Sequence, residues 1–390
     1  MKIKKSQRNS RFFFHRMGLI FFFLPLLILV LGIVLPDRGF SEKENRVLAS
    51  APGLKLNQLT SGGFEKQFET YENDQFPLRD LWITLKASAD RLMGKVEENG
   101  VLLGKNGYLM EEFKSPVQTQ YDSTVKAMTD FAQRHSELKQ YALIAPNSVN
   151  ILKDKLPAFA PVTDQNLWLD DLKDSLTAAG VTFIDVRATF QDHKMEDLYY
   201  HTDHHWTTLG AYYGYQALAA AMKLDTSKAP AMKSYAVTNS FNGTLSATSG
   251  YETDYNEPIY IYAPDDLKTA PQVVVNNVNE KKKTATLYDT SKLKEKDKYA
   301  LFLGGNYPVL DIRTTADTTD RLLLVKDSYA NSVIPFLTAY YREIIVVDPR
   351  YYYDDIREVM KKNKITSVLF LYNGNTFVQD NSISGVLQND

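Results

Sequence analysis

The sequence predicts an α/β fold in which a parallel sheet is flanked by helices and follows a membrane-spanning helix near the N-terminus. Short apolar runs alternate with segments of helical periodicity, a pattern typical of a sheet with helices on both faces. An uncharged apolar stretch at residues 17–35 is about 19 residues long, enough to cross a bilayer. Hydrophobic residues make up 44% of the 390 positions, which indicates a packed globular protein rather than a disordered one.

The first 35 residues read as a signal anchor. Residues 1–16 contain only basic charges, and a basic flank stays in the cytoplasm, so the rest of the chain is expected outside. A cleaved signal peptide is the alternative. We favour the anchor because the apolar run exceeds the usual signal core of about 7 to 15 residues. The expected location is the cell membrane, with one span and an extracellular catalytic domain.

A stem is expected at residues 36–100, before a main domain at 101–385. Within the stem, residues 64–93 have the amphipathic pattern of a helix broken around Pro77. Residues 99–110 read as a β-hairpin with its turn at Asn106-Gly107.

The main domain alternates predicted strands and helices, with one β-rich insertion at residues 225–319. The insertion has a turn signal at Asn242-Gly243 and a charged hairpin tip at 280–283. In a sheet of this kind, ligands bind beyond the carboxyl ends of the strands. Helices are expected at 123–134, 167–179 and 356–362; main-sheet strands at 141–145, 181–186, 322–325, 344–347 and 367–371; and insertion strands at 257–262, 272–275 and 285–288.

Three of the chain's 6 histidines lie within one short segment, His201, His204 and His205, and Asp203 stands among them. Residues 198–200 read as a strand, and Thr207 or Thr208 can cap a following helix. In an extended segment, Asp203 and His205 would point to the same side, so the carboxylate could orient the imidazole as a general base. The nearby helix N-terminus would disfavour an imidazolium ion.

The segment TDHHWT resembles the signature of the DHHW proteins and the related motif of alginate O-acetyltransferase proteins of the AlgJ/AlgX type. The resemblance runs from about residue 40 to the C-terminus. It implies an SGNH-hydrolase-like domain that handles acetyl esters on exported polysaccharides. It also implies a multi-pass membrane-bound O-acyltransferase as a partner that supplies the acetyl group.

Ser328 is the predicted nucleophile, because it follows a buried apolar run at a strand-to-helix turn. Its alternative role is a simple helix cap, and Ser332 is the second choice of nucleophile. The sequence Lys326-Asp327-Ser328 resembles the Gly-Asp-Ser element of the SGNH superfamily, with Lys326 where glycine is usual. The residues considered as oxyanion donors or substrate contacts, for which turn chemistry is an equal alternative, are Gly304, Gly305, Asn306 and Asn373.

These patterns predict a polysaccharide O-acetyltransferase or acetylesterase with a Ser328-His205-Asp203 triad and no cofactor. An inactive polysaccharide-binding or scaffold protein is a second hypothesis. A metal-dependent hydrolase is a third, with ligands among His201, Asp203 and His205, while His204 points away. The chain has 0 Cys, which excludes a thiol nucleophile, and its net charge of -2 makes nucleic acid an unsuitable partner.

Overall fold

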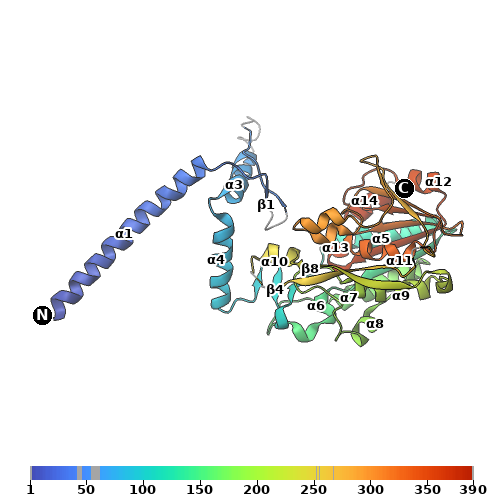
Figure 1. Cartoon of the computed structure of the whole chain (residues 1–390), viewed down its shortest axis with the longest axis horizontal. Coiled ribbons are helices and arrows are strands. Elements are labelled where there is room, and N and C mark those ends of the chain that lie inside the picture. Colours follow the sequence, from blue (N-terminus) through green and yellow to red (C-terminus); the bar gives the residue numbers. More distant parts are fainter. Residues whose placement is uncertain are drawn as a thin grey trace. The chain divides into compact units, whose positions relative to one another are not determined.

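The computed structural model describes residues 2–41, 46–53, 62–251, 253, 255–266 and 268–388 (Figure 1). The chain divides into two compact units, residues 1–93 and 94–390.

The first unit begins with the predicted apolar helix. Helix α1 (Lys2–Val34) contains a segment, Phe14–Val34, with a mean hydropathy of 2.9 and no buried residue, so an N-terminal helix of membrane-spanning length is confirmed. The amphipathic segment at 64–93 forms two helices that are separated around Pro77, as predicted. The other elements of this unit are β1 (Phe40–Ser41), β2 (Arg46–Val47), α3 (Gly63–Gln75) and α4 (Arg79–Leu92).

The second unit is built on an eight-stranded sheet with the strand order β11-β10-β12-β14-β13-β15-β6-β7. From β14 to β7 all neighbours are parallel, but β12, β10 and β11 are antiparallel. The strands are β6 (Lys139–Ala145), β7 (Thr182–Phe183), β10 (Val273–Asn277), β11 (Lys282–Thr284), β12 (Val309–Thr314), β13 (Arg321–Lys326), β14 (Glu343–Val347) and β15 (Ser367–Asn373).

The sheet is therefore mixed, whereas the sequence predicted a parallel one. The β-rich insertion adds β10, β11 and β12 to the main sheet, with β11 at the edge and β12 next to β14. A tight hairpin joins β10 to β11, and a two-to-five-residue connection can only produce antiparallel neighbours. Residues 285–288 form no strand, and part of the predicted hairpin tip belongs to β11.

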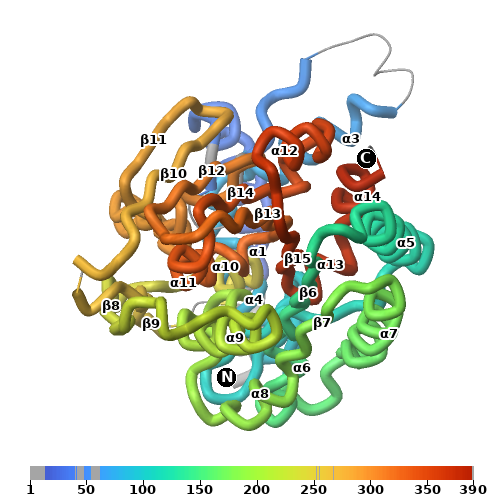
Figure 2. The backbone as a smooth tube through the Cα atoms, turned by 90° about the vertical axis from the view of Figure 1, so that its right-hand side faces the viewer, coloured from blue at the N-terminus to red at the C-terminus, as the bar shows by residue number. Residues whose placement is uncertain are grey.

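Helices cover both faces of the sheet. Figure 2 shows α5, α12 and α14 on one side and α9 and α11 on the other. The predicted helices at 123–134, 167–179 and 356–362 are confirmed within a few residues, as α5, α7 and α12. The helices are α5 (Gln118–Arg134), α6 (Ser148–Ile151), α7 (Gln165–Ala178), α8 (Arg187–Asp192), α9 (Thr208–Ala221), α10 (Thr244–Ser249), α11 (Ile334–Leu337), α12 (Ile356–Asn363), α13 (Gly374–Gln379) and α14 (Ser382–Gln388).

Two smaller sheets complete this unit. Strands β3 (Glu97–Glu98), β4 (Val101–Leu103) and β5 (Leu109–Glu111) form a three-stranded sheet, and β8 (Met232–Phe241) pairs with β9 (Glu257–Pro264) as a long hairpin. Asn106 and Gly107 both have positive φ, as their predicted turn requires.

The carboxyl ends of β13, β15 and β6 lie at one edge of the sheet. Lys326, Asn373 and Ala145 end these strands, and neighbouring parallel strands are in register there. The Asp348 N–H, just after β14, donates to the Pro308 carbonyl just before β12 (3.2 Å). This is the edge at which an open α/β sheet binds its ligands.

Candidate active site

Three residues that lie far apart in the sequence form one continuous hydrogen-bond chain. The Nδ1 atom of His205 lies 2.5 Å from Oδ1 of Asp203, and its Nε2 atom lies 2.7 Å from Oγ of Ser328. An ionised carboxylate only accepts hydrogen bonds, so Nδ1 carries the proton and Nε2 can accept the proton of Ser328. The structure therefore brings a carboxylate, an imidazole and a hydroxyl together in the order that a nucleophile triad requires.

The segment that carries Asp203 and His205 does not have the extended conformation that the sequence predicted. Residues 198–206 fold back on themselves, closed by an isolated antiparallel bridge between Tyr199 and Trp206. The backbone N–H of His205 donates to Oδ1 of Asp203 (3.0 Å), which makes a local turn. A turn, rather than the alternation of a strand, places the carboxylate beside the imidazole.

Asp203 is buried, and its second oxygen is held by the start of α10. The backbone N–H and the hydroxyl of Thr244 donate to Oδ2 of Asp203 at 2.8 and 2.9 Å. Burial by itself would raise the pKa of Asp203, but the imidazoles of His205 and His204 and the hydrogen bonds hold that pKa well below its usual range. Asp203 therefore remains ionised and can orient the imidazole.

His205 is also buried, and Tyr299 lies flat against it. The two ring centroids are 3.7 Å apart and the ring planes differ by 12°. Burial, together with neighbouring His204, lowers the pKa of His205 to about 4, although the Asp203 carboxylate acts in the opposite direction. The imidazole is thus neutral at neutral pH. The main cause is burial, not the helix N-terminus that the sequence suggested.

Ser328 begins a short 3-10 helix (Ser328–Ser332) directly after β13, and Asp327 caps this helix. Oδ1 of Asp327 accepts the N–H of Tyr329 (2.9 Å), while Oδ2 accepts both the backbone N–H (2.9 Å) and the side-chain amide (2.6 Å) of Asn373. The alternative interpretation of Ser328 as the cap is therefore wrong. As the first residue of the helix, Ser328 has a backbone N–H with no acceptor within the helix.

Residues 198–206 are called the histidine loop below, and the turn that carries Ser328 is called the nucleophile turn. Trp206 joins the two. Its fully buried ring donates through Nε1 to the Tyr329 carbonyl (3.1 Å) and lies 3.0 Å from Oγ of Ser332. The Ser332 hydroxyl also accepts a hydrogen bond from Tyr299 (3.1 Å). Ser332, the second choice of nucleophile, is thus hydrogen-bonded to Trp206 and Tyr299. Ser328 is the residue that contacts the imidazole.

Lys326 occupies the position where the SGNH superfamily usually has glycine, and it is buried. Its Nζ atom lies 2.7 Å from Oδ1 of Asn306 and 3.4 Å from Oδ2 of Asp348. The side-chain amide of Asn331 donates to the same Asn306 oxygen (3.1 Å). Burial lowers the pKa of Lys326, and the Asp348 carboxylate opposes this effect. Because both neighbours of Oδ1 are donors, the Asn306 amide has a defined orientation.

The other residues considered for substrate contact take part in turns. Gly304 and Gly305 have φ values of 81° and 122°, which residues with a side chain rarely adopt. Asn373 is buried, and its side-chain amide donates to Asp327 (2.6 Å) and to the Thr376 hydroxyl (2.7 Å). In the structure, Asn373 therefore anchors the nucleophile turn to the end of β15.

The three histidines of the loop have different surroundings. Nδ1 of His201 lies 3.3 Å from Oε2 of Glu257, whereas the ring of His204 lies 3.9 Å from that of His205. Potential metal-binding atoms of Asp203, His204 and His205 lie within 4.8 Å of one another. The expectation that His204 points away is wrong. The potential metal-binding atoms of Asp203 and His205 already take part in the hydrogen-bond chain with Ser328.

Sequence reasoning missed several residues that hold this site. Thr244 follows the Asn242-Gly243 turn signal, which marked the turn but not its closeness to Asp203. Tyr299 is one of 24 tyrosines and has no local signal. Glu257, which accepts from the backbone N–H groups of two loop residues at 2.8 and 2.9 Å, lies in a predicted strand and reads there as an ordinary polar residue.

Gly243 must stay small, which gives a first testable prediction. A Cβ atom at this position would lie 2.3 Å from Cβ of Asp203 and 2.5 Å from its Oδ2 atom. Gly243→Ala is therefore expected to displace Asp203, to lower the free energy of unfolding by about 1–3 kcal/mol and to reduce ester hydrolysis. Urea unfolding and a hydrolysis assay on the same preparation measure both effects.

Gly385→Ala is the matched control. A Cβ at this position in α14 meets nothing within 4 Å, so the variant should be as active as the original protein and at least as stable. Unchanged stability and activity in Gly243→Ala would contradict the close packing of Asp203.

Comparison with known proteins gives one family match and several relatives. The model of the family described as DHHW protein matches residues 86–347. Over 201 residues the chain is 25% identical to the probable alginate O-acetylase AlgJ of Pseudomonas aeruginosa, an alignment that covers 49% of this chain and 50% of that protein. The chain spans about half the length of the curated relatives it matches.

Two solved structures share the fold. A DHHW family protein from Eubacterium siraeum aligns with a TM-score of 0.63 and 22% identity, covering 76% of this chain and 97% of that one. Bacillus cereus PatB1, solved with a sulfonyl adduct, aligns with a TM-score of 0.58 and 21% identity, covering 72% and 97%. The mixed α/β architecture of the second unit is thus shared with both.

Proposed function

The chain belongs to the DHHW protein family, and on this premise we propose that it transfers acetyl groups to, or removes them from, a polysaccharide outside the cytoplasm. The hydrogen-bond chain of Asp203, His205 and Ser328 carries the proposal, because this arrangement activates a serine toward an ester carbonyl. The name of the curated relatives, probable alginate O-acetylase, supports acetyl transfer as the reaction and a polysaccharide as the substrate class.

In the proposed reaction, Ser328 Oγ attacks the acetyl carbonyl carbon while His205 Nε2 takes the hydroxyl proton. The tetrahedral intermediate collapses to acetyl-serine, and protonated His205 gives its proton to the leaving alcohol. A sugar hydroxyl then passes its proton to His205 and attacks the carbonyl carbon of the acetyl-serine. The second tetrahedral intermediate collapses, Ser328 Oγ leaves, and His205 returns the proton to it; water takes the place of the sugar in an esterase. Asp203 stays ionised throughout and stabilises the imidazolium that forms.

We propose that the Ser328 N–H and the Asn306 side chain stabilise the oxyanion. The Asn306 oxygen is occupied by Lys326 and Asn331, so its NH₂ group is the end that can face a ligand. Lys326 would then replace the usual glycine as a residue that orients the oxyanion donor. Backbone donors at Gly304 or Gly305 and a substrate contact by Asn373 remain predictions.

Asn306→Ala is expected to lower kcat for a small acetyl ester about 10²- to 10³-fold with little change in KM, because an oxyanion donor acts mainly in the transition state. Steady-state hydrolysis kinetics measure the two constants separately. If Lys326 acts through Asn306, Lys326→Met combined with Asn306→Ala should be no slower than Asn306→Ala alone. An unchanged kcat in Asn306→Ala would remove it from this role.

The pH dependence of the reaction follows from the burial of His205. The base works only when neutral, so kcat/KM should fall about tenfold per pH unit below a pKa of about 4 and stay level from there to neutral pH. Initial rates with an acetyl ester between pH 3 and 8 measure the profile, with circular dichroism at each pH as a control for unfolding. An inflection near 6.5, the ordinary value for imidazole, would contradict a strong effect of burial.

We also propose an arrangement at the membrane. Residues 1–16 form a cytoplasmic tail, 17–35 a signal anchor, 36–100 a stem, and 101–385 an SGNH-hydrolase-like domain outside the cell. The basic residues that precede α1's apolar segment support this orientation. A multi-pass membrane-bound O-acyltransferase is the proposed source of the acetyl group.

Mass spectrometry of the full-length protein after exposure to an acetyl ester tests the proposed function. An acetyl group is expected on the peptide that contains Ser328, and it should disappear when a polysaccharide acceptor is added. Rapid ester hydrolysis without acetylation of that peptide would contradict the triad mechanism. An inert protein would favour a non-catalytic scaffold.

A further inference from the structure

A pocket separate from the triad lies between the start of α9 and the β8–β9 hairpin, and His201 of the histidine loop lines it. Its volume is about 440 Å³, and its wall contains three acidic side chains and a group of tyrosines. The acids are Glu196, Asp197 and Glu257, and the tyrosines discussed below are Tyr200, Tyr255 and Tyr260. None of these residues takes part in the proposed acetyl transfer.

One buried hydroxyl in this wall has no hydrogen-bond partner among the described residues. Tyr200 is only 2% exposed, yet its OH group makes no hydrogen bond within the part of the chain that the structure describes. That oxygen is itself enclosed by protein atoms, so a ligand in the pocket would not reach it.

The pocket has the features of a sugar site. Tyr255 and Tyr260 are 39% and 41% exposed, so parts of both rings are open to solvent beside carboxylates. A half-exposed aromatic face packs against the C–H face of a sugar ring, and carboxylates accept hydrogen bonds from its hydroxyl groups. Tyr255 is held in place because its ring stacks on His201, with centroids 4.3 Å apart.

The charge of the wall selects the class of sugar. The wall contains three carboxyl side chains, and no Lys or Arg is among the described residues that line it. Asp197 makes no side-chain hydrogen bond or ion pair with the described residues, so its carboxylate is available to a ligand. A uronic acid would meet like charges without a counter-cation, whereas a neutral or amino sugar would not.

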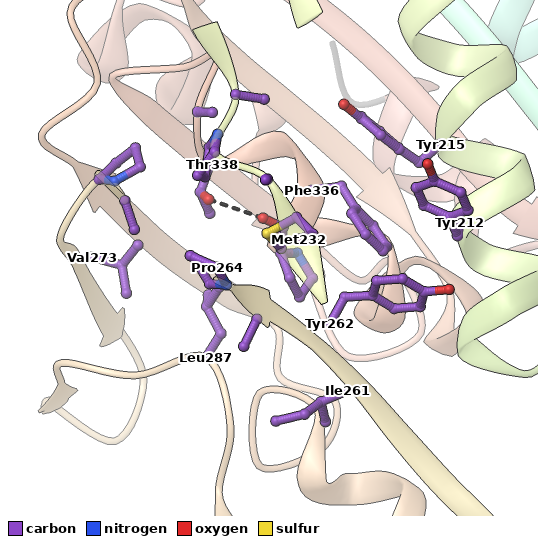
Figure 3. A pocket seen from close by; sticks show the side chains of 18 of the residues that line it. Tyr212, Tyr215, Met232, Ile261, Tyr262, Pro264, Val273, Leu287, Phe336 and Thr338 are labelled. Carbon is purple, nitrogen blue, oxygen red and sulfur yellow. Dashed lines mark hydrogen bonds between the residues drawn. The ribbon is translucent and has the colours of Figure 1, made fainter. Parts of the chain in front are cut away.

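A larger apolar cavity shares one wall residue, Tyr262, with this pocket. Its volume is about 950 Å³, and no charged residue is among those that line it in the described part of the chain. Figure 3 shows Tyr212, Tyr262 and Phe336 grouped at one end of this cavity. The Tyr212 and Tyr262 rings are stacked, 5.2 Å apart. Two adjoining pockets with tyrosine walls provide room for more than one sugar residue.

The pocket is also close to the triad. The Tyr200 ring contacts Tyr299 with centroids 6.3 Å apart, and Tyr299 lies against His205. We propose that the pocket walled by Asp197, Tyr255 and Tyr260 is a subsite for a neutral or amino sugar of the polysaccharide. This inference rests on the proposed function for its polymeric substrate, and it departs from the anionic polymer named for the curated relatives.

Binding measurements without an acetyl donor separate this proposal from the proposed chemistry. The full-length Ser328→Ala protein in detergent is titrated by calorimetry with three hexasaccharides: oligoglucosamine, its N-acetylated form and oligomannuronate. The first two are expected to bind at least about tenfold more tightly than the third. Tighter binding of oligomannuronate, or no saturable binding of any of the three, would overturn the subsite.

Tyr255→Ala in the same background should weaken binding of the preferred hexasaccharide about tenfold, because the stacking face is lost. Tyr235→Ala is the matched control: Tyr235 is 45% exposed on the same hairpin and lines neither pocket, so binding should not change. Equal affinities in the two variants would overturn the proposal.

The Tyr255→Ala substitution in the otherwise unchanged protein distinguishes a failure of the subsite proposal from a failure of the proposed acetyl transfer. This variant should hydrolyse a small acetyl ester at the original rate. A loss of ester hydrolysis in this variant would mean that Tyr255 supports the triad rather than a subsite. If the unsubstituted protein does not hydrolyse esters but still binds the hexasaccharides selectively, the proposed acetyl transfer is rejected and the subsite is not.

Discussion

Replacing Ser328 with alanine is expected to lower acetyl ester hydrolysis about 10⁴- to 10⁶-fold, since loss of a triad nucleophile removes the covalent route entirely. The hydroxyl is the group that Nε2 of His205 contacts at 2.7 Å. Removing one oxygen leaves the surrounding turn intact, because Asp327 and Asn373 hold it through other atoms. Hydrolysis rates and acetylation of the Ser328 peptide measure the loss.

Ser332→Ala is the control for this prediction. The Ser332 hydroxyl accepts hydrogen bonds from Trp206 and Tyr299, and each of these buried donors also has a backbone carbonyl as a second acceptor. We expect Ser332→Ala to destabilise the protein by about 0.5–1.5 kcal/mol and to slow the reaction far less than Ser328→Ala does. A larger loss of activity in Ser332→Ala than in Ser328→Ala would exchange the two assignments.

Replacing Asp203 with asparagine is expected to lower the rate about 10⁴-fold with little change in shape. An amide at this position can present an N–H to Nδ1 of His205, which would move the imidazole proton to Nε2 and block acceptance from Ser328. The backbone N–H and the hydroxyl of Thr244 donate to Oδ2 of Asp203 and would hold the carbonyl oxygen of the new amide there, so its NH₂ group would face His205. Steady-state kinetics, with circular dichroism as a check on folding, measure the effect.

The two adjacent histidines provide the control. His205→Gln removes the base and should cost orders of magnitude in rate, while His204→Gln should cost much less. His204 is hydrogen-bonded through Nδ1 to the Thr244 hydroxyl (2.8 Å) and does not contact Ser328. Comparable losses in the two variants would mean that His204 has a direct part in the reaction.

The elements of the fold could largely be read from local patterns. The apolar helix at residues 17–35, the break at Pro77 and the buried strand before Ser328 each follow from composition and periodicity over a few turns. The order of strands could not be read in this way. The antiparallel edge of the sheet depends on which strand the insertion pairs with, and that choice is made by packing between distant segments.

The candidate site was predicted in its residues but not in its local shape. Asp203 and His205 were expected in an extended segment between a strand and a helix, yet their segment is a closed turn whose conformation depends on the start of α10 and on Glu257. The hydrogen-bond partners of Lys326 lie in other segments, so the reason for a lysine in that position could not be seen from its neighbours in the chain.

From the sequence alone came the types of reactive groups, the apolar N-terminal helix and the alternation of strands and helices, because each depends on side chains close together in the chain. Tertiary packing decided the rest. The Ser328 hydroxyl meets the His205 imidazole across 123 residues only because β13 ends beside the histidine loop. Burial of that imidazole under Tyr299, which keeps it neutral, is likewise a property of the folded chain, since local sequence does not specify which ring covers it.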